Sequence, residues 1–216
     1  MADFIVKNNP NFVDVYCVKW GTKYDRSFVE KLKDSVEKHL TIKHKFHCLT
    51  DKPEEDYDEE IFVPYLHGVW NKMTLFSKIG KCLYFDLDVE INGNIDWLVW
   101  NEEDFDKLTL INSMSWVDPK LMSLDRFVFR NNTFINSSVM RWGDSYKIFE
   151  RFMEKRDLYI RLYSGIDRFI FNERNRINLK YRTFNTNEIS SWQEGIKNNT
   201  IMIYNGKYSD VQPDNN

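Results

Sequence analysis

The stretch that decides the fold is Lys81-Cys82-Leu83-Tyr84-Phe85-Asp86-Leu87-Asp88-Val89, an apolar run that ends in two aspartates. Its composition predicts a buried strand, and in an extended chain residues i and i+2 share a face. We therefore expect Asp86 and Asp88 to converge, while Leu87 points the other way into apolar packing. Two neighbouring carboxylates suit Mg²⁺ or Mn²⁺, and such an ion usually completes its shell with phosphate oxygens. The motif predicts a metal ion and a phosphorylated ligand.

A simpler interpretation is a strand end with two solvated aspartates. Aspartates two residues apart are common, so the motif alone does not decide between the two interpretations. A buried strand, however, has little reason to end in paired negative charge unless something neutralises that charge. This argument favours the metal site.

The first fifty residues predict a strand, a helix and a second strand. Residues 12–18 and 46–51 are apolar runs typical of buried strands. Between them, Ser27 and Glu30 match a capping box, and an apolar stripe at helical spacing predicts a helix over residues 27–40. Such a unit favours a parallel sheet with its ligands at the carboxyl ends of the strands. Further along we expect helices over 69–79 and 144–155, with Asp144 as a cap, and strands over 108–111, 134–140 and 201–204.

Composition limits the class of protein. A chain of 216 residues is long enough for one α/β domain with a sizeable core. Its formal net charge of −3 argues against general nucleic-acid binding. The sequence contains no run of 18 apolar residues and no apolar leader, so we expect a cytoplasmic protein without a membrane span.

The sequence around the aspartates is Gly68-Val69-Trp70-Asn71-Lys72-Met73-Thr74-Leu75-Phe76-Ser77 upstream and Glu90-Ile91-Asn92-Gly93-Asn94-Ile95-Asp96-Trp97-Leu98 downstream. Residues 68–98 resemble the core of nucleotide-sugar glycosyltransferases of the GT-A fold, especially glycogenin-like, phage and bacterial members. The resemblance extends more loosely over most of the chain. It implies an α/β fold: a single GT-A (Rossmann-like) domain over residues 1–208, with a mixed, mainly parallel central sheet flanked by helices. Residues 209–216 would be a polar tail.

The same resemblance implies a function. The expected reaction is metal-dependent transfer of a sugar from a nucleotide-diphosphate sugar, with a UDP-sugar as the expected donor. The acceptor stays unidentified, and the glycogenin-like pattern implies retention of the anomeric configuration. Asp86 and Asp88 are the expected ligands of Mn²⁺ or Mg²⁺ beside the diphosphate.

Residues near the first strand and the aspartates complete the expected donor site. Lys72 lies one helix ahead of the aspartates, where the family pattern places a basic residue, and we expect it to neutralise the diphosphate during catalysis. Val18, Trp20 and Tyr24 lie where this fold usually receives the nucleotide base, and Leu87 joins them as part of the aspartate motif. Tyr24 is a candidate to stack on uracil; the alternative is an aromatic packed within its loop.

Two later segments are expected to meet the sugar. Asn136, Ser137 and Ser138 interrupt an apolar strand with small polar side chains, which need hydrogen-bond partners that a hydroxylated ring provides. Asp167 is a candidate catalytic residue that orients donor or acceptor hydroxyls, although Arg168 stands where relatives commonly carry Gln. The alternative for Asp167 is an N-cap of the next helix.

The last predicted strand resembles the closing strand of the family, which usually ends in His-Gly-x-Lys with the His as a metal ligand. Here Asn205 stands at the His position. An amide oxygen also binds Mg²⁺ or Mn²⁺, but it is a weaker donor than imidazole toward softer ions. We expect Gly206 and Lys207 to approach the diphosphate.

Two other functions stay open. The run from Tyr84 to Val89 also resembles the first motif of haloacid-dehalogenase-like phosphatases, with Asp86 as nucleophile and Asp88 as acid/base. That motif normally lies on the first strand, whereas here a whole strand-helix-strand unit precedes it. The second alternative is a nucleotide-sugar-binding relative that has lost turnover, which the missing His at Asn205 and the altered pair Asp167-Arg168 support.

Overall fold

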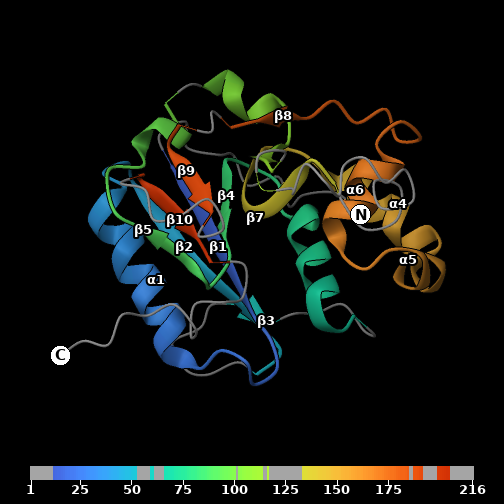
Figure 1. Cartoon of the computed structure of the whole chain (residues 1–216), viewed down its shortest axis with the longest axis horizontal. Helices are drawn as coiled ribbons and strands as arrows, with labels where there is room; N and C mark the ends of the chain where they lie inside the picture. Colours follow the sequence, from blue (N-terminus) through green and yellow to red (C-terminus); the bar gives the residue numbers. More distant parts are fainter. Residues whose placement is uncertain are drawn as a thin grey trace, which may run out of the picture.

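The fold of the chain is given by a computed structural model, shown in Figure 1. It describes residues 12–52, 59–60, 66–100, 102–113, 116, 133–184, 187–191 and 199–204. Residues 205–216, and with them the predicted polar tail, lie outside the described residues.

Seven strands of the described chain form the main sheet. In their order across the sheet they are β3 (Glu59–Glu60), β2 (His44–Thr50), β1 (Val13–Lys19), β4 (Cys82–Phe85), β7 (Ile135–Trp142), β6 (Thr109–Asn112) and β8 (Arg182–Thr183). The pairs β3/β2, β2/β1, β1/β4 and β6/β8 are parallel, while β7 runs antiparallel to both β4 and β6. The prediction of a mixed, mainly parallel sheet is confirmed.

A smaller sheet joins segments that are far apart in the sequence. It consists of β5 (Val89–Ile91), β10 (Ile201–Ile203) and β9 (Ile189–Ser191), with β10 antiparallel to β5 and parallel to β9. Because β5 follows the aspartate motif directly, the pairing with β10 brings the described end of the chain beside that motif.

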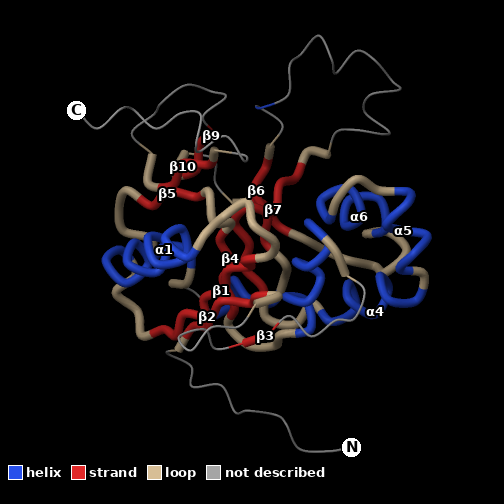
Figure 2. The backbone as a smooth tube through the Cα atoms, turned by 90° about the horizontal axis from the view of Figure 1, so that it is seen from below, coloured by secondary structure: helices blue, strands red, loops and turns tan. Residues whose placement is uncertain are grey.

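Helices cover both faces of the main sheet, as Figure 2 shows. On one side lies α1 (Arg26–His39), and on the other lie α4 (Tyr146–Glu154), α5 (Arg156–Leu162) and α6 (Ile166–Glu173). Three 3₁₀ helices complete the described elements: η1 (Gly68–Ser77), η2 (Asp96–Leu98) and η3 (Glu102–Asp106). The segment predicted as a helix over 69–79 is thus a 3₁₀ helix.

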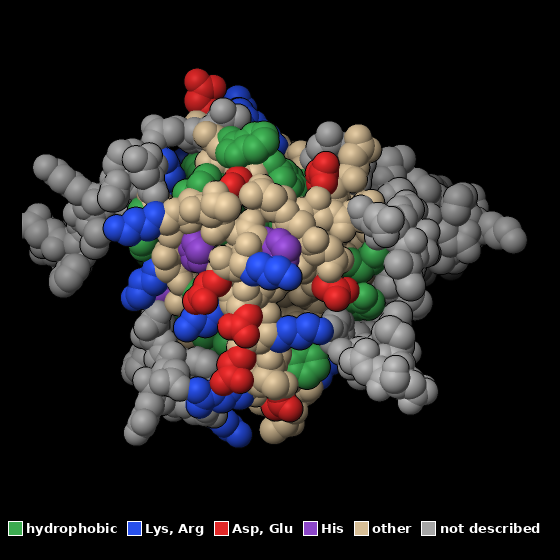
Figure 3. Space-filling model, turned by 90° about the vertical axis from the view of Figure 1, so that its left-hand side faces the viewer, with side chains coloured by type: hydrophobic (Ala, Val, Ile, Leu, Met, Phe, Trp, Pro, Cys, Tyr) green, Lys and Arg blue, Asp and Glu red, His purple; other side chains and the backbone are tan. Residues whose placement is uncertain are grey.

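The helix α1 is amphipathic, and its start differs from the prediction. Asp25 is the N-cap, and its Oδ1 accepts hydrogen bonds from the Ser27 backbone N–H at 2.9 Å and from the Ser27 hydroxyl at 2.5 Å. The predicted capping box at Ser27 and Glu30 is therefore wrong, because the N-cap is Asp25, two residues before Ser27. Figure 3, which views the molecule from the side of α1, shows acidic and basic side chains interspersed over this face.

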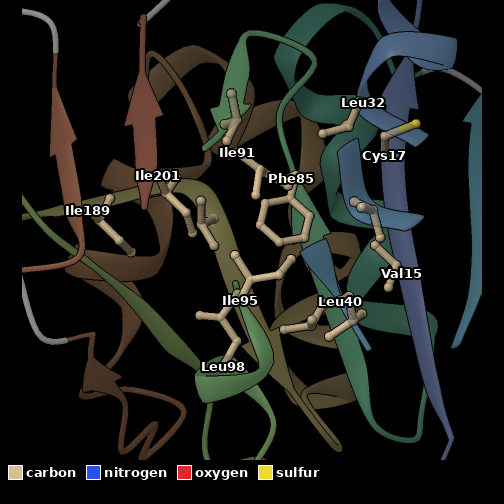
Figure 4. Packing of buried hydrophobic residues seen from close by; sticks show 14 of the residues in the cluster. Val15, Cys17, Leu32, Leu40, Phe85, Ile91, Ile95, Leu98, Ile189 and Ile201 are labelled. Atoms are coloured by element: carbon tan, nitrogen blue, oxygen red, sulfur yellow. The ribbon is translucent and has the colours of Figure 1, made fainter. Parts of the chain in front are cut away.

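The inner face of α1 packs on an apolar core shared with both sheets. Leu32 and Leu40 meet Val15 of β1 and Phe85 of β4 in this cluster, which Figure 4 shows together with Ile201 of β10. Complete burial of an aliphatic side chain contributes about 1.5–3 kcal/mol. This core fixes the end of β4, where the aspartate motif begins.

A second core on the opposite face holds η1 in place. The Trp70 ring of η1 stacks on Phe152 of α4, with ring centres 5.1 Å apart, and Phe169 of α6 meets Phe152 edge-on at 5.4 Å. From α4, Ile148 and Phe152 are fully buried, and Phe149 packs against this core while partly exposed. Lys72 follows Trp70 on η1, so this packing positions its side chain.

Within the described ranges, no helix combines the length and apolar character needed to cross a lipid bilayer.

Candidate active site

A cavity of about 320 Å³ opens at the carboxyl ends of β1 and β4. The residues of the predicted site that line it are Val18, Trp20, Tyr24, Lys72, Asp86, Leu87, Asp88, Asn136, Ser137, Ser138 and Asp167. Asn205, Gly206 and Lys207 lie outside the described residues, so their roles stay predictions. The parallel arrangement of β1 and β4 explains the convergence, because both strands end at the same edge of the sheet.

The aspartates reach the cavity from a turn and not from an extended strand. The strand β4 ends at Phe85, Asp86 donates its backbone N–H to the Ser138 carbonyl at 2.8 Å, and the Val89 N–H donates to the Asp86 carbonyl at 3.1 Å. The predicted geometry of two residues on one face of a strand is therefore wrong beyond Phe85. Leu87 is buried in the apolar core as predicted, although part of it also borders the cavity.

Asp86 is held by a cation and a phenol. The Lys72 Nζ lies 2.5 Å from Asp86 Oδ1, and the Tyr84 hydroxyl donates a hydrogen bond to the same oxygen. The Lys72 ammonium also lies 5.1 Å from the centre of the Tyr84 ring. Burial, followed by the charge and hydrogen bond of Asp86, raises the pKa of Tyr84, so this hydroxyl stays protonated and remains a donor.

Asp88 is fixed by Tyr24. The Tyr24 hydroxyl donates to Asp88 Oδ2 at 3.2 Å, and the backbone N–H of Tyr204 donates to the Asp88 carbonyl at 3.3 Å. Burial and the charge of Asp88 raise the pKa of Tyr24, which keeps this phenol a donor. The Lys23 Nζ lies 4.6 Å from the Tyr24 ring centre. Stacking of Tyr24 on a nucleotide base stays a prediction, and the hydrogen bond to Asp88 is an additional role.

Two of the polar side chains of β7 find partners within the protein. Asn136 Oδ1 accepts the backbone N–H of Ser138 at 2.8 Å, and Ser137 hydrogen-bonds the carboxylate of Asp167. The Asn136 side-chain oxygen and Ser137 therefore do not need a bound sugar as a partner. Their position beside the cavity keeps sugar contact as a prediction.

Asp167 lies in the first turn of α6, and Gly165 is the N-cap of that helix. The alternative that Asp167 is the N-cap is thus wrong. Its Oδ1 is buried, and no hydrogen-bond partner for it occurs in the described part of the chain. Burial raises the pKa of Asp167, with Lys72 and the hydrogen bonds from Ser137 acting against the shift and Asp86 adding to it. An acceptor atom beside the cavity is left for a donor from a ligand.

The site fits a divalent metal only in part. Asp86 and Asp88 offer hard carboxylate oxygens of the kind that Mn²⁺ and Mg²⁺ prefer. Across the described ranges, no group of three or more His, Cys, Asp or Glu side chains is placed to hold a metal ion. Two carboxylates therefore suit an ion whose remaining ligands are water and the oxygens of a bound diphosphate.

Comparison with solved structures decides the fold. The chain is similar to a galactosyltransferase, LgtC, solved with donor and acceptor sugar analogues: the TM-score is 0.61 at 12% identity, over 89% of this chain and 87% of that one. The chain has the GT-A fold. A glycosyltransferase involved in glycosylation of the major capsid of PBCV-1 gives a TM-score of 0.59 at 12% identity over 92% and 96% of the two chains.

A third similar structure is the glycosyltransferase GlyE of Streptococcus pneumoniae TIGR4. Its TM-score is 0.59 at 11% identity, over 88% of this chain but only 54% of GlyE. No family model matches the sequence, and no curated protein does. At these identities the comparisons establish the GT-A fold alone, and they do not establish an activity for this chain.

Three lining residues were not among the predicted ones: Lys23, Val69 and Tyr84. A signal for Tyr84 was present, because it precedes Asp86 by two residues, and residues two apart in an extended chain share a face. Lys23 adjoins Tyr24 in an exposed loop, where a lysine is ordinary. Val69 precedes Trp70 in a segment whose 3₁₀ geometry was not predicted from the sequence.

Proposed function

We propose that this protein is a metal-dependent glycosyltransferase that uses a nucleotide-diphosphate sugar, with a UDP-sugar as the expected donor. The observation that carries the proposal is the gathering of Asp86, Asp88, Lys72 and Asp167 around one cavity at the carboxyl ends of β1 and β4. The GT-A fold adds support, since the similar solved structures are glycosyltransferases.

In this proposal Asp86 and Asp88 hold Mn²⁺ or Mg²⁺, an ion that supplies positive charge to the diphosphate as the glycosidic bond breaks. The Lys72 ammonium forms an ion pair with Asp86 Oδ1. We expect the lysine to exchange this contact for a phosphate oxygen when the donor binds. Its flexible ammonium then neutralises charge that develops on the leaving group.

Asp167 is proposed to position the sugar. Its buried Oδ1 lacks a partner in the described chain, and a sugar hydroxyl is a donor of the right kind. The three carboxylates among the lining residues are Asp86, Asp88 and Asp167, and the first two are committed to the diphosphate end. We propose retention of the anomeric configuration on the basis of the family resemblance. We assign no residue as the nucleophile of a double-displacement mechanism.

The described fold gives the phosphatase hypothesis no support, because β4 is not the first strand and the similar structures are glycosyltransferases. An inactive relative that binds nucleotide sugars remains the second candidate. It is supported by Asn205, which stands where the family usually has a His.

One experiment separates these functions. Purified protein is incubated with Mn²⁺ and a panel of UDP-sugars, and the release of UDP and of free phosphate is measured. The proposal expects metal-dependent UDP release from at least one donor in wild type and none in Asp86→Asn. Phosphate release from p-nitrophenyl phosphate that is lost in Asp86→Asn would instead indicate a phosphatase. Donor binding without turnover across the panel and a range of sugar acceptors would indicate an inactive relative.

A further inference from the structure

A second cavity, of about 360 Å³, lies at the other end of the main sheet. The antiparallel pair β4/β7 shows the direction: Phe85 is opposite Val139 near the candidate active site, whereas Cys82 is opposite Trp142 at the far end. The chain leaves β7 after Trp142 and enters the wall of this cavity. The lining residues are Asp106, Lys107, Leu108, Asp144, Ser145, Lys147, Ile148, Ile177, Asn178, Leu179 and Lys180.

Positive charge gathers around this cavity from three separate segments. Lys107 precedes β6, Lys147 lies in the first turn of α4, and Lys180 follows the turns after α6. Within the described ranges, Lys147 and Lys180 take part in no ion pair. Lys147 and Lys180 thus bring two exposed ammonium groups to one cavity from distant parts of the sequence.

The two acidic residues of the lining are already engaged. Asp106 Oδ2 lies 3.4 Å from the Lys107 Nζ, and Asp106 Oδ1 lies 3.4 Å from an Arg182 guanidinium nitrogen. Asp144 Oδ1 accepts the backbone N–H of Tyr146 at 3.0 Å. The N-cap of α4 is Ser145, so the prediction of Asp144 as the cap is wrong by one residue. The lining therefore carries three lysines against two aspartates, a formal excess of one positive charge.

Ser145 adds a hydrogen-bonding group that the protein leaves unused. It is the N-cap of α4, a position where a serine hydroxyl normally accepts a helix N–H, yet it makes no such bond here. The residue is 4% exposed, and its Oγ has no hydrogen-bond partner within the described chain. Buried hydroxyls are rarely left without a partner, so this one points to a ligand group.

We propose that this cavity is a second ligand site, which binds the phosphate group of a small phosphorylated molecule. Lys147 and Lys180 supply charge, the Ser145 hydroxyl donates a hydrogen bond to a phosphate oxygen, and the positive end of the nine-residue helix α4 faces the same anion. The site is separate from the candidate active site and does not depend on the proposed transferase activity.

The test is a titration of isotope-labelled full-length protein with pyrophosphate at constant ionic strength, followed by the amide resonances of residues 144–148 and 178–180. We expect saturable shifts at these amides. Affinity should fall about tenfold or more in Lys147→Ala/Lys180→Ala, which loses two charge-assisted contacts. Lys33→Ala/Lys38→Ala on α1 removes the same charge from an exposed helix and should leave the affinity unchanged.

Ser145→Ala separates a ligand role from a structural one. Because the hydroxyl has no partner in the free protein, its removal should not lower the thermal unfolding temperature, yet it should weaken pyrophosphate binding several-fold. Sedimentation with phosphatidylcholine vesicles that contain phosphatidic acid shows whether the phosphate belongs to a lipid headgroup. Binding to vesicles, lost in the lysine double variant, would assign that source; no vesicle binding assigns a free molecule.

The proposal fails if pyrophosphate produces no saturable shift at these amides. It fails equally if the Lys147/Lys180 and Lys33/Lys38 double variants bind pyrophosphate with the same affinity, because the cavity would then contribute only its general charge.

Discussion

The contact between Lys72 and Asp86 leads us to predict that removal of a site residue increases the affinity for Mn²⁺. Replacing Lys72 by Met should tighten the binding of Mn²⁺ in the absence of nucleotide, although the same change should lower turnover. The reason is competition: the ammonium lies 2.5 Å from Asp86 Oδ1, an oxygen that a metal ion would also use. Met keeps the length and apolar stem of the side chain while removing the charge.

The size of the effect follows from the geometry of this pair. Two unit charges 2.5 Å apart attract by about 7 kcal/mol at an effective dielectric constant of about 20. Loss of hydration offsets most of this, and the net value of a hydrogen bond to a charged group is about 1.5–3 kcal/mol. The side chains are only 15% and 21% exposed, so solvent screens the pair weakly. Since 1.4 kcal/mol corresponds to a factor of ten, Mn²⁺ should bind about ten- to a hundredfold more tightly.

Calorimetric titration of wild type and Lys72→Met with Mn²⁺, without nucleotide, measures this change. Lys23→Met is the matched control, because Lys23 borders the same cavity but contacts the ring of Tyr24 and not Asp86. Equal Mn²⁺ affinity in wild type and Lys72→Met would refute the competition. A gain in Lys23→Met as large as that in Lys72→Met would show that only general charge matters. With donor present, kcat/KM of Lys72→Met should fall by on the order of ten- to a thousandfold.

Three further predictions concern the same site. Asp86→Asn and Asp88→Asn should each abolish Mn²⁺-dependent UDP binding in calorimetry while the circular dichroism spectrum stays unchanged; UDP affinity like that of wild type would remove the metal role. Asp167→Asn should raise the thermal unfolding temperature at neutral pH and leave it unchanged in strong acid, because a raised folded-state pKa means that stability present at low pH is lost as the pH rises through it. The reverse pH trend would contradict the assignment. Asn205→His should tighten Mn²⁺ at saturating UDP, since imidazole is the better ligand, and an unchanged affinity would place Asn205 away from the metal.

Local patterns predicted the core elements well, because each carries its periodicity within its own residues. The first helix was expected over 27–40 and runs over Arg26–His39, and the strand expected over 134–140 runs over Ile135–Trp142. The N-cap of the first helix was misplaced, since Asp25 and Ser27 are both good capping residues and only the backbone conformation selects between them. Element boundaries depend on such competitions.

The missed elements depend on contacts between distant residues. The strands β5, β8 and β9 have two or three residues each, too few to show a period, and β5 becomes a strand by pairing with β10 more than a hundred residues later. The helix α5 also went unpredicted, and a helix at the position of α6 was anticipated only in the alternative that made Asp167 its N-cap. Their apolar residues serve the second core, in which aromatic rings from η1, α4, α5 and α6 meet.

The sequence predicted the location of the aspartates in the fold better than the backbone conformation that carries them. Asp86 and Asp88 reach one cavity, as expected, but through a turn that Ser138 and Val89 stabilise by backbone hydrogen bonds. The i, i+2 rule therefore gave the right neighbourhood for an incomplete reason. The rule applies better to Tyr84 and Asp86, because the Tyr84 hydroxyl donates a hydrogen bond to Asp86 Oδ1 at the end of the strand.

Two acids on the helix α6 show how the structure separates a packing role from a candidate functional one. Glu173 is fully buried, and although burial favours its neutral form, hydrogen bonds from Tyr163 and Arg151 outweigh that effect and hold its pKa below the usual range. For Asp167 the balance is reversed: burial dominates, one oxygen lacks a partner in the described chain, and the pKa is raised. A fold that can satisfy one buried carboxylate so fully has little structural reason to leave another unsatisfied on the same helix. The unsatisfied one lines the cavity that also holds Lys72, which is where a ligand would supply the missing partner.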